Sequence, residues 1–180
     1  MVYVLLGTGF EEIEALTPVD LLRRAGAEVK TVGLNGKIVY GGHAIGVTCD
    51  MTIDELDVRD ADMIVLPGGL GGVASIRGCS KALEAVKAVY EQKKFVAAIC
   101  AGPTVLAELG LLTGVRATCY PGQIPNMRDA LVVSDAACVT DGRIITGTSA
   151  GTAIPFALAL IEALKGPEAA KVIADQIVIR

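Results

Sequence analysis

The stretch that decides the fold of this chain is Phe95-Val96-Ala97-Ala98-Ile99-Cys100-Ala101-Gly102-Pro103. Its apolar first half predicts a buried strand, and a cysteine follows directly at the carboxyl end of that strand. Helical spacing then resumes over Gly102–Glu108. Small residues around the cysteine allow the sharp strand-to-helix turn known as a nucleophile elbow. Such a turn would raise the Cys100 sulfur above the sheet, where a substrate can reach it.

Short apolar runs alternate with helical patterns on both sides of this stretch, which predicts a parallel α/β sheet. The predicted strands are Val2–Leu6, Glu28–Leu34, Met63–Leu66, Phe95–Ile99, Ala117–Cys119, Ala137–Val139, Ile144–Thr146 and Gln176–Ile179. The predicted helices are Glu12–Ala25, Lys81–Gln92, Thr152–Leu164 and a short closing helix. The turn signal Asn35-Gly36 predicts that Lys37–Tyr40 returns as a hairpin, which Ile45–Cys49 extends as an antiparallel flap. We therefore expect a flavodoxin-like, doubly wound, mostly parallel sheet sandwiched between helices, with a small β-hairpin flap.

The composition supports a packed core and excludes some partners. The chain has 180 residues, 52% hydrophobic and 20% charged, so a single domain can bury a sizeable core. Its formal net charge of −4 provides no electrostatic footprint for nucleic acid or for an anionic membrane. The first residues lack a signal-peptide pattern, and no apolar stretch is long enough to span a bilayer. We expect a cytoplasmic protein without nucleic-acid or membrane partners.

The cysteines are odd in number and widely spaced: Cys49, Cys79, Cys100, Cys119 and Cys138. No CxxC pair occurs, so neither a zinc site nor a dithiol redox motif is expected. Reduced thiols in the cytosol are the plain interpretation. Cys49, Cys79 and Cys138 are predicted to pack structurally, and Cys49 is predicted to be partly exposed and oxidisable. His43 is the only histidine, and we interpret it as an exposed loop residue.

Ligands of doubly wound sheets gather at the carboxyl ends of the strands, near the topological switch point. Three predicted loops fit this position: Gly7–Glu14, Pro67–Gly72 and Cys100–Pro103. The pair Gly68-Gly69 either makes an ordinary tight turn or lets backbone N–H groups approach a substrate oxyanion. Both interpretations stay open on the sequence alone.

The thiol of Cys100 would be activated by the helix that follows it, because an N-terminal dipole and free N–H groups lower a thiol pKa. Glu14 is expected to point inward beside this thiol, with a raised pKa, so that the neutral acid can relay a proton. Favourable charge at a helix N-terminus suffices to explain Glu11 and Glu12. Tyr120 is either a core residue or a hydroxyl donor to the site.

Several motifs together are similar to one known family: Glu11-Glu12-Ile13-Glu14, Thr17-Pro18-Val19-Asp20, Arg23-Arg24-Ala25-Gly26, Val65-Leu66-Pro67-Gly68-Gly69, Ala97–Pro103, Gly151-Thr152, Phe156-Ala157-Leu158 and Ile161–Leu164. Over nearly its whole length the chain resembles the ThiJ/PfpI superfamily and, within it, the branch of the Parkinson-disease-linked protein deglycase. The resemblance implies a single class I glutamine amidotransferase-like domain over residues 1–180, usually in a homodimer.

The resemblance also implies an activity and its residues. Cys100 would be the reactive, oxidation-prone nucleophile and Glu14 its protonated partner, while Gly68, Gly69 and the Ala101 backbone would line the site. Members look like cofactor-free glyoxalases that turn methylglyoxal into lactate, or deglycases that act on glycated thiols and amines, with a role in oxidative stress. The chain departs from the family pattern at two places, and both bear on catalytic rate and substrate range. Many members have histidine where Tyr120 stands, and residues 147–150 lack the arginine-glycine-proline motif of close relatives.

Three other interpretations compete with this one. The first is a redox sensor or chaperone whose Cys100 is oxidised to a sulfinate instead of turning over a substrate. The second is a peptidase or amidase, whose family branch usually places histidine directly after the cysteine, where this chain has Ala101. The third is the thiazole-monophosphate biosynthesis label of some relatives, for which the sequence offers no phosphate-binding loop.

Overall fold

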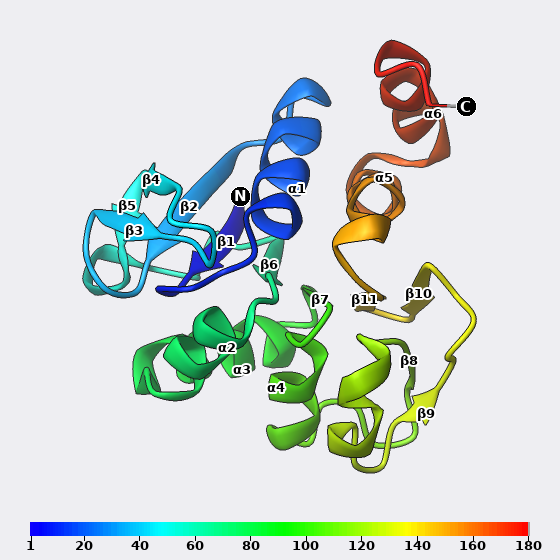
Figure 1. Ribbon diagram of the computed structural model, residues 1–180. Helices are drawn as coiled ribbons and strands as arrows, with labels where there is room; N and C mark the ends of the chain where they lie inside the picture. The colour runs from blue at the N-terminus through cyan, green and yellow to red at the C-terminus, as the bar shows by residue number, and fades with distance from the viewer. Residues whose placement is uncertain (180) are drawn as a thin grey trace.

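A seven-stranded sheet forms the centre of the computed structural model, which describes residues 1–179 (Figure 1). Its strand order is β10-β11-β7-β6-β1-β2-β5, and every neighbouring pair is parallel except β10 with β11. The strands are β1 (Val2–Leu6), β2 (Val29–Gly33), β5 (Met51–Thr52), β6 (Met63–Leu66), β7 (Phe95–Ile99), β10 (Cys138–Asp141) and β11 (Ile144–Gly147). The predicted mostly parallel sheet is confirmed.

Helices cover both faces of this sheet (Figure 1). One layer holds α1 (Glu12–Arg24) and α5 (Ala153–Lys165), with α6 (Pro167–Gln176) packed on α5; the other holds α2 (Leu70–Arg77), α3 (Ser80–Glu91) and α4 (Pro103–Glu108). Successive strand residues alternate between the layers: Val2, Val4 and Leu6 join the α1–α5 core, whereas Tyr3 and Leu5 join the other. The doubly wound, flavodoxin-like sandwich is therefore confirmed.

The strand order places a topological switch point beside β1. From β1 the chain first builds outward through β2 to β5, and then returns to build β6, β7 and β11 on the other side of β1. The connections that follow β1 and β6 consequently leave the sheet toward opposite faces, which opens a crevice at the carboxyl ends of these strands. The loop after β7 adjoins the same crevice.

A hairpin flap lies outside the central sheet. Its strands β3 (Ile38–Tyr40) and β4 (Gly46–Thr48) pair antiparallel, as predicted. The prediction that Lys37–Tyr40 folds back on the second strand is wrong, because β1 and β5 already occupy both edges of β2. A second small sheet pairs β8 (Arg116–Ala117) with β9 (Leu131–Val132) in parallel.

Two further sequence predictions are wrong at the level of single segments. The predicted strand Gln176–Ile179 instead ends α6 and forms a turn, since the Ile177 and Ile179 N–H groups donate to Ile173 and Ala174 carbonyls. Cys49, predicted to be partly exposed, is 1% exposed.

Helix α2 follows β6 but has no counterpart among the predicted helices. Its first turn contains Gly71 and Gly72, which have low helix propensity. A Cβ at Gly72 would lie 2.7 Å from the Phe10 Cα atom, so packing against the loop after β1 demands glycine there. Tertiary packing thus overrides the local preference.

The packing of α5 predicts that substitutions at a buried and at an exposed position of this helix lower the free energy of unfolding by very different amounts. Leu160 is 0% exposed in the core between α5 and the sheet, whereas Glu162 is exposed on the same helix. Replacing Leu160 by Ala should lower the free energy of unfolding in urea by about 2–5 kcal/mol, because a buried cavity remains. The matched Glu162→Ala variant should change it by less than about 0.5 kcal/mol. Equal losses in the two variants would contradict this assignment of the core.

Candidate active site

The elbow predicted around Cys100 is present. Strand β7 ends at Ile99, and Cys100 adopts a left-handed backbone conformation with φ of 63°. The Cys100 N–H donates to the Gly147 carbonyl at 3.0 Å, and the Cys100 carbonyl accepts from the Tyr120 N–H at 2.9 Å. Helix α4 begins three residues later, at Pro103. Neighbouring backbone on both sides therefore fixes the cysteine at the carboxyl end of the sheet.

Glu14 reaches this cysteine from the other side of the switch point. It lies in the first turn of α1 and is 1% exposed. The Gly68 N–H donates to Glu14 Oε2 at 2.9 Å. A Cβ on Gly68 would lie 2.7 Å from Cys100 Cβ and 3.1 Å from Cys100 Sγ, and would overlap Glu14 Oε2. Only glycine fits between the carboxyl group and the thiol.

Burial and mutual interaction shift the pKa values of this pair. Burial raises the pKa of Glu14 to about 7, against the hydrogen bonds from Cys100 and Gly68 that lower it. Burial, followed by the charge of Glu14 and a hydrogen bond with it, raises the pKa of Cys100 to about 12. The pair therefore loses one proton near pH 7 and the other near pH 12.

The predicted direction is right for Glu14 and wrong for the thiol. We expected the helix N-terminus to lower the Cys100 pKa, yet α4 has only 6 residues, and burial and the Glu14 charge outweigh the N–H groups of Ala101 and Gly69. Between the two titration steps the pair holds one proton and one negative charge. A thiolate then exists to the extent that the shared proton resides on Glu14.

The other predicted site residues divide into three groups. The N–H groups of Gly69 and Ala101 hydrogen-bond to the Cys100 sulfur and favour its anionic form. The Gly68 N–H, predicted to face an oxyanion, is instead bound to Glu14, so Gly68 serves as the spacer between acid and thiol. Tyr120 meets the site through its backbone, while its side chain is 49% exposed and, among residues 1–179, its hydroxyl makes no hydrogen bond to protein.

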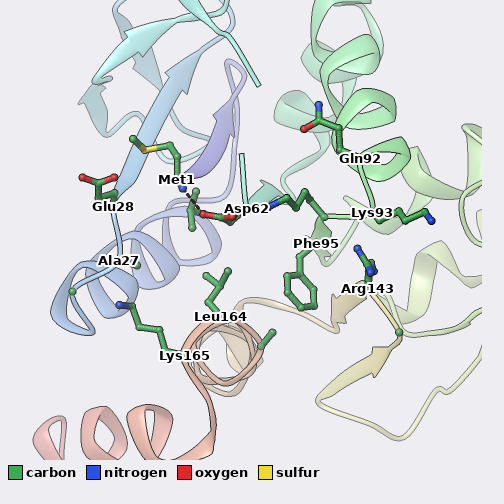
Figure 2. A pocket seen from close by; sticks show the side chains of 15 residues that line it. Met1, Ala27, Glu28, Asp62, Gln92, Lys93, Phe95, Arg143, Leu164 and Lys165 are labelled. Carbon is green, nitrogen blue, oxygen red and sulfur yellow. Dashed lines mark hydrogen bonds and ion pairs between the residues drawn. The ribbon is translucent and has the colours of Figure 1, made fainter. Parts of the chain in front are cut away.

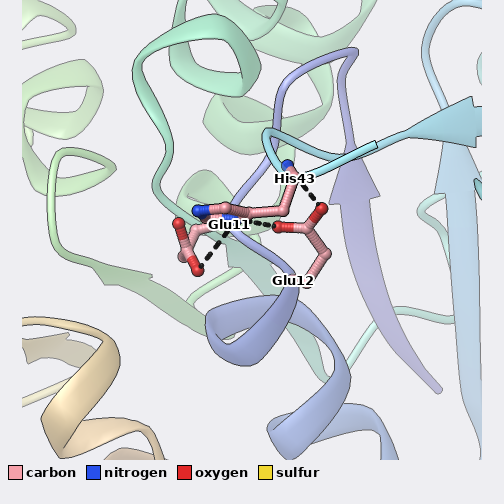
Figure 3. A group of neighbouring side chains, drawn as sticks. All are labelled: Glu11, Glu12 and His43. Carbon is pink, nitrogen blue, oxygen red and sulfur yellow. Dashed lines mark hydrogen bonds and ion pairs between the residues drawn. The ribbon is translucent and has the colours of Figure 1, made fainter. Parts of the chain in front are cut away.

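The contacts between Glu12 and His43, near the site, were not predicted from the sequence. Glu12, interpreted as a helix-terminal charge, is only 5% exposed, and His43 from the flap binds it: the His43 N–H and Nδ1 each lie 2.8 Å from a Glu12 carboxylate oxygen (Figure 3). Glu11 stands 3.8 Å from the same Nδ1. These residues have the chemistry of metal ligands, but His43 already engages both Glu12 oxygens.

A cavity outside the candidate site lies at the opposite edge of the sheet, around the amino ends of β1 and β7. It measures about 950 Å³ and is lined by Met1, Val2, Gly26, Ala27, Glu28, Asp62, Gln92, Lys93, Lys94, Phe95, Gly142, Arg143, Ala163, Leu164 and Lys165 (Figure 2). Asp62 pairs there with the Met1 ammonium at 2.7 Å and with Lys94 at 2.9 Å. Lysines at helix C-termini, such as Lys165, complement the helix dipole. Neither Cys100 nor Glu14 lines this cavity, so it is separate from the candidate active site.

The fold and the site define a class: flavodoxin-like α/β proteins with a cysteine on a nucleophile elbow and a buried glutamic acid beside it. Within this class the chain belongs to the DJ-1/PfpI family, whose model matches residues 1–163. No helix within residues 1–179 has the length and apolar character to cross a membrane.

Individual relatives agree with this assignment. The crystal structure of Drosophila melanogaster DJ-1beta is 35% identical, with a TM-score of 0.95 over 99% of this chain and 97% of that chain. Oxidised Toxoplasma gondii DJ-1 is 35% identical, with a TM-score of 0.92 over 98% of this chain and 97% of that chain. A protein of Pyrococcus abyssi named as a deglycase is 32% identical over 91% of this chain and 99% of its own length.

The coupled pair predicts how Glu14→Gln changes thiol reactivity. In the wild type, the rate of Cys100 alkylation by iodoacetamide should rise through about pH 7, as the pair loses its first proton, and rise again only toward pH 12. The glutamine removes the charge but not the burial, so the thiol should titrate in a single step above its ordinary value of 9.0 and below 12. Peptide mass spectrometry across pH measures both profiles.

The control for this experiment is Glu84→Gln, which removes a carboxylate from α3 on the surface away from the elbow. It should keep both steps of the wild-type profile. A persistent step near pH 7 in Glu14→Gln would show that another group shares the proton of Cys100.

Proposed function

We propose that this protein is a cysteine-dependent, cofactor-free glyoxalase that converts methylglyoxal to lactate, with a related deglycase action on glycated thiols and amines. The observation that carries the proposal is the contact across Gly68, where a buried acid and an elbow thiol share one proton at the end of a sheet. Membership of the DJ-1/PfpI family and a relative named as a deglycase support it. The homodimer and the cytoplasmic location stay predictions.

The first step is the capture of the aldehyde. The shared proton moves to Glu14, and the Cys100 thiolate attacks the aldehyde carbon of methylglyoxal to form a carbon–sulfur bond. The carbonyl electron pair becomes an oxyanion, which the Gly69 and Ala101 N–H groups can stabilise because they already face the sulfur. Glu14 then gives its proton to this oxygen, which leaves a neutral hemithioacetal and a carboxylate.

The second step moves a proton between carbons. The Glu14 carboxylate removes the proton from the former aldehyde carbon, which leaves an enediolate and a neutral Glu14. The hydroxyl proton of the enediolate passes to its other oxygen, and Glu14 returns its proton to the neighbouring carbon. The product is a lactoyl thioester on Cys100, in which one carbon has been oxidised and the other reduced. Water hydrolyses the thioester, releases lactate and restores the thiol. A group with a pKa of about 7 suits both roles of Glu14 at neutral pH.

A redox sensor is the second candidate, because the same contacts suit an oxidised sulfur. Peroxide would oxidise the thiolate to a sulfenic acid and release hydroxide. A second peroxide would give the sulfinic acid and water, and the sulfinic acid would lose its proton to the hydroxide to become the sulfinate. The N–H groups that face the sulfur and a protonated Glu14 can donate hydrogen bonds to sulfinate oxygens. The solved structure of Toxoplasma gondii DJ-1, a 35% identical relative, is of an oxidised form. Peroxide-dependent mass gain without methylglyoxal turnover would favour this candidate.

The decisive variant for turnover is Cys100→Ser. Formation of lactate from methylglyoxal should fall by about 10³-fold or more, as expected when a covalent nucleophile is removed. Cys79→Ser is the matched control, since Cys79 is a partly buried thiol at the N-cap of α3, where serine is well tolerated. It should retain the wild-type rate. Lactate formation by Cys100→Ser at a rate near that of the wild type would reject the scheme.

A further inference from the structure

The tip of the β3–β4 flap is fastened to the start of α1. The Gly42 N–H donates to the Phe10 carbonyl at 2.8 Å. The His43 backbone N–H donates to Glu12 Oε1 at 2.8 Å, and the His43 ring places Nδ1 2.8 Å from Glu12 Oε2 (Figure 3). Both oxygens of one carboxylate therefore hold one residue of the flap. Of these contacts, only the one made by the ring changes its charge with pH near neutrality.

Glu12 is an unusual partner because it is buried. It is 5% exposed, and Gly41 of the flap packs so closely on its carboxylate that a Cβ there would overlap Glu12 Oε1. Although burial opposes its charge, the hydrogen bonds from His43 keep the pKa of Glu12 below its ordinary value. The flap and the carboxylate thus depend on each other: removing His43 leaves a buried negative charge without its cation.

The same short loop also carries the candidate active site. The Glu11 N–H donates to the Gly68 carbonyl at 3.0 Å, while the Gly68 N–H donates to Glu14 Oε2 at 2.9 Å. Gly68 is therefore held on one side by the residue next to Glu12 and on the other by the proton-sharing acid. The negative charge of Glu11 also acts on Glu14 and raises its pKa. These contacts connect His43, through Glu12 and Glu11, to Gly68 and Glu14.

We propose that His43 is a positioning residue of the Cys100 site. Its imidazolium holds the flap against Glu12 and balances the negative charges at the start of α1. The protonation state of His43 thereby controls the pH at which Glu14 and Cys100 lose the first of their two protons. The proposal rests on the proposed role of Cys100 and Glu14 and adds regulation of that site by pH. It makes His43 neither nucleophile nor base.

The sign of the effect follows from the neighbours of His43. The charged groups that face it are Glu12 and Glu11, and residues 38–48 of the hairpin contain no other charged side chain. The hydrogen bond to Glu12, then the charges of Glu11 and Glu12, raise the pKa of His43 above 6.5. The stabilisation of the flap is therefore complete below pH 6.5 and is lost as pH rises through the raised value. Above it, Glu11 and Glu12 lose their counter-charge, which favours the proton on Glu14.

Hydrogen exchange of the flap amides tests the first half of the proposal. After correction for intrinsic exchange rates, protection of residues 38–48 in the wild type should fall by about twofold to fivefold between about pH 6 and about pH 9, as the ion pair is lost. His43→Gln should show the low value throughout. His43→Lys, which keeps a positive charge over this range, should show protection without that pH dependence.

Alkylation of Cys100 by iodoacetamide tests the second half and needs no turnover. In His43→Gln the step that lies near pH 7 in the wild type should move to higher pH, because the uncompensated Glu11 and Glu12 charges hold the proton on the pair. His43→Lys should restore the wild-type position. Lys37→Gln is the matched control: it removes a cation beside the same hairpin, where Lys37 Nζ donates to the Asp50 carbonyl and not to α1. It should leave the step in place.

Three outcomes are informative. Shifts in both flap protection and alkylation, with rescue by lysine, support the proposal even if methylglyoxal proves not to be a substrate. A shift in flap protection alone overturns it, because His43 then stabilises only the hairpin. Unchanged profiles in His43→Gln overturn it outright, and in that case lactate formation by the wild type would still stand as evidence for the proposed function.

Discussion

The candidate site can form only because the residue at position 68 has no side chain. Gly68 lies between a carboxyl group from the α1 layer and a thiol from the end of β7, and its N–H binds the carboxyl group while its open Cα lets the thiol approach. Two groups that would each be neutral when buried alone are brought close enough to share a proton. Every chemical role considered for Cys100 depends on that proximity, whether the sulfur attacks a carbonyl carbon or is oxidised by peroxide.

The fold explains why these groups can meet although they lie far apart in the sequence. Glu14 follows β1, Gly68 follows β6 and Cys100 follows β7, and these three strands are adjacent in the sheet. Parallel strands direct all three carboxyl ends to one edge, and the switch point beside β1 keeps the loops apart. Helices on both faces bury the strands that carry these three loops. Function is thus added at a place that the architecture leaves open.

The sequence predicted best where one segment determines its own structure. Continuous apolar runs defined β1, β6 and β7 to the residue, and the small residues after Ile99 correctly indicated the elbow. Failures arose where distant segments decide. Gln176–Ile179 resembles a strand, but its N–H groups bond back to the end of α6. Glu12 and His43 are 31 residues apart, and no local pattern shows that the flap buries one beneath the other.

The acidity of the Cys100 thiol also could not be predicted from the local sequence. Its position followed from the pattern around Cys100, but its acidity depends on burial and on the charge of a residue from another layer, and the predicted direction failed for that reason. The inward direction predicted for Glu14 is confirmed, because Glu14 is 1% exposed, although its neighbour Ile13 is 54% exposed. That Gly68 binds Glu14 instead of a substrate oxygen could be learned only from three-dimensional geometry.

The left-handed backbone of Cys100 has a consequence for the evolution of the chain. A residue with a Cβ at φ of 63° destabilises the native state by about 1–3 kcal/mol relative to glycine. Selection for thermal robustness alone would therefore replace this cysteine by glycine, and the resulting protein would be sturdier and chemically inert. A lineage that keeps a cysteine here loses part of a free energy of unfolding that is only about 5–15 kcal/mol in most proteins. Persistence of cysteine at this position among descendants would thus record a demand for reactivity, independent of any assay.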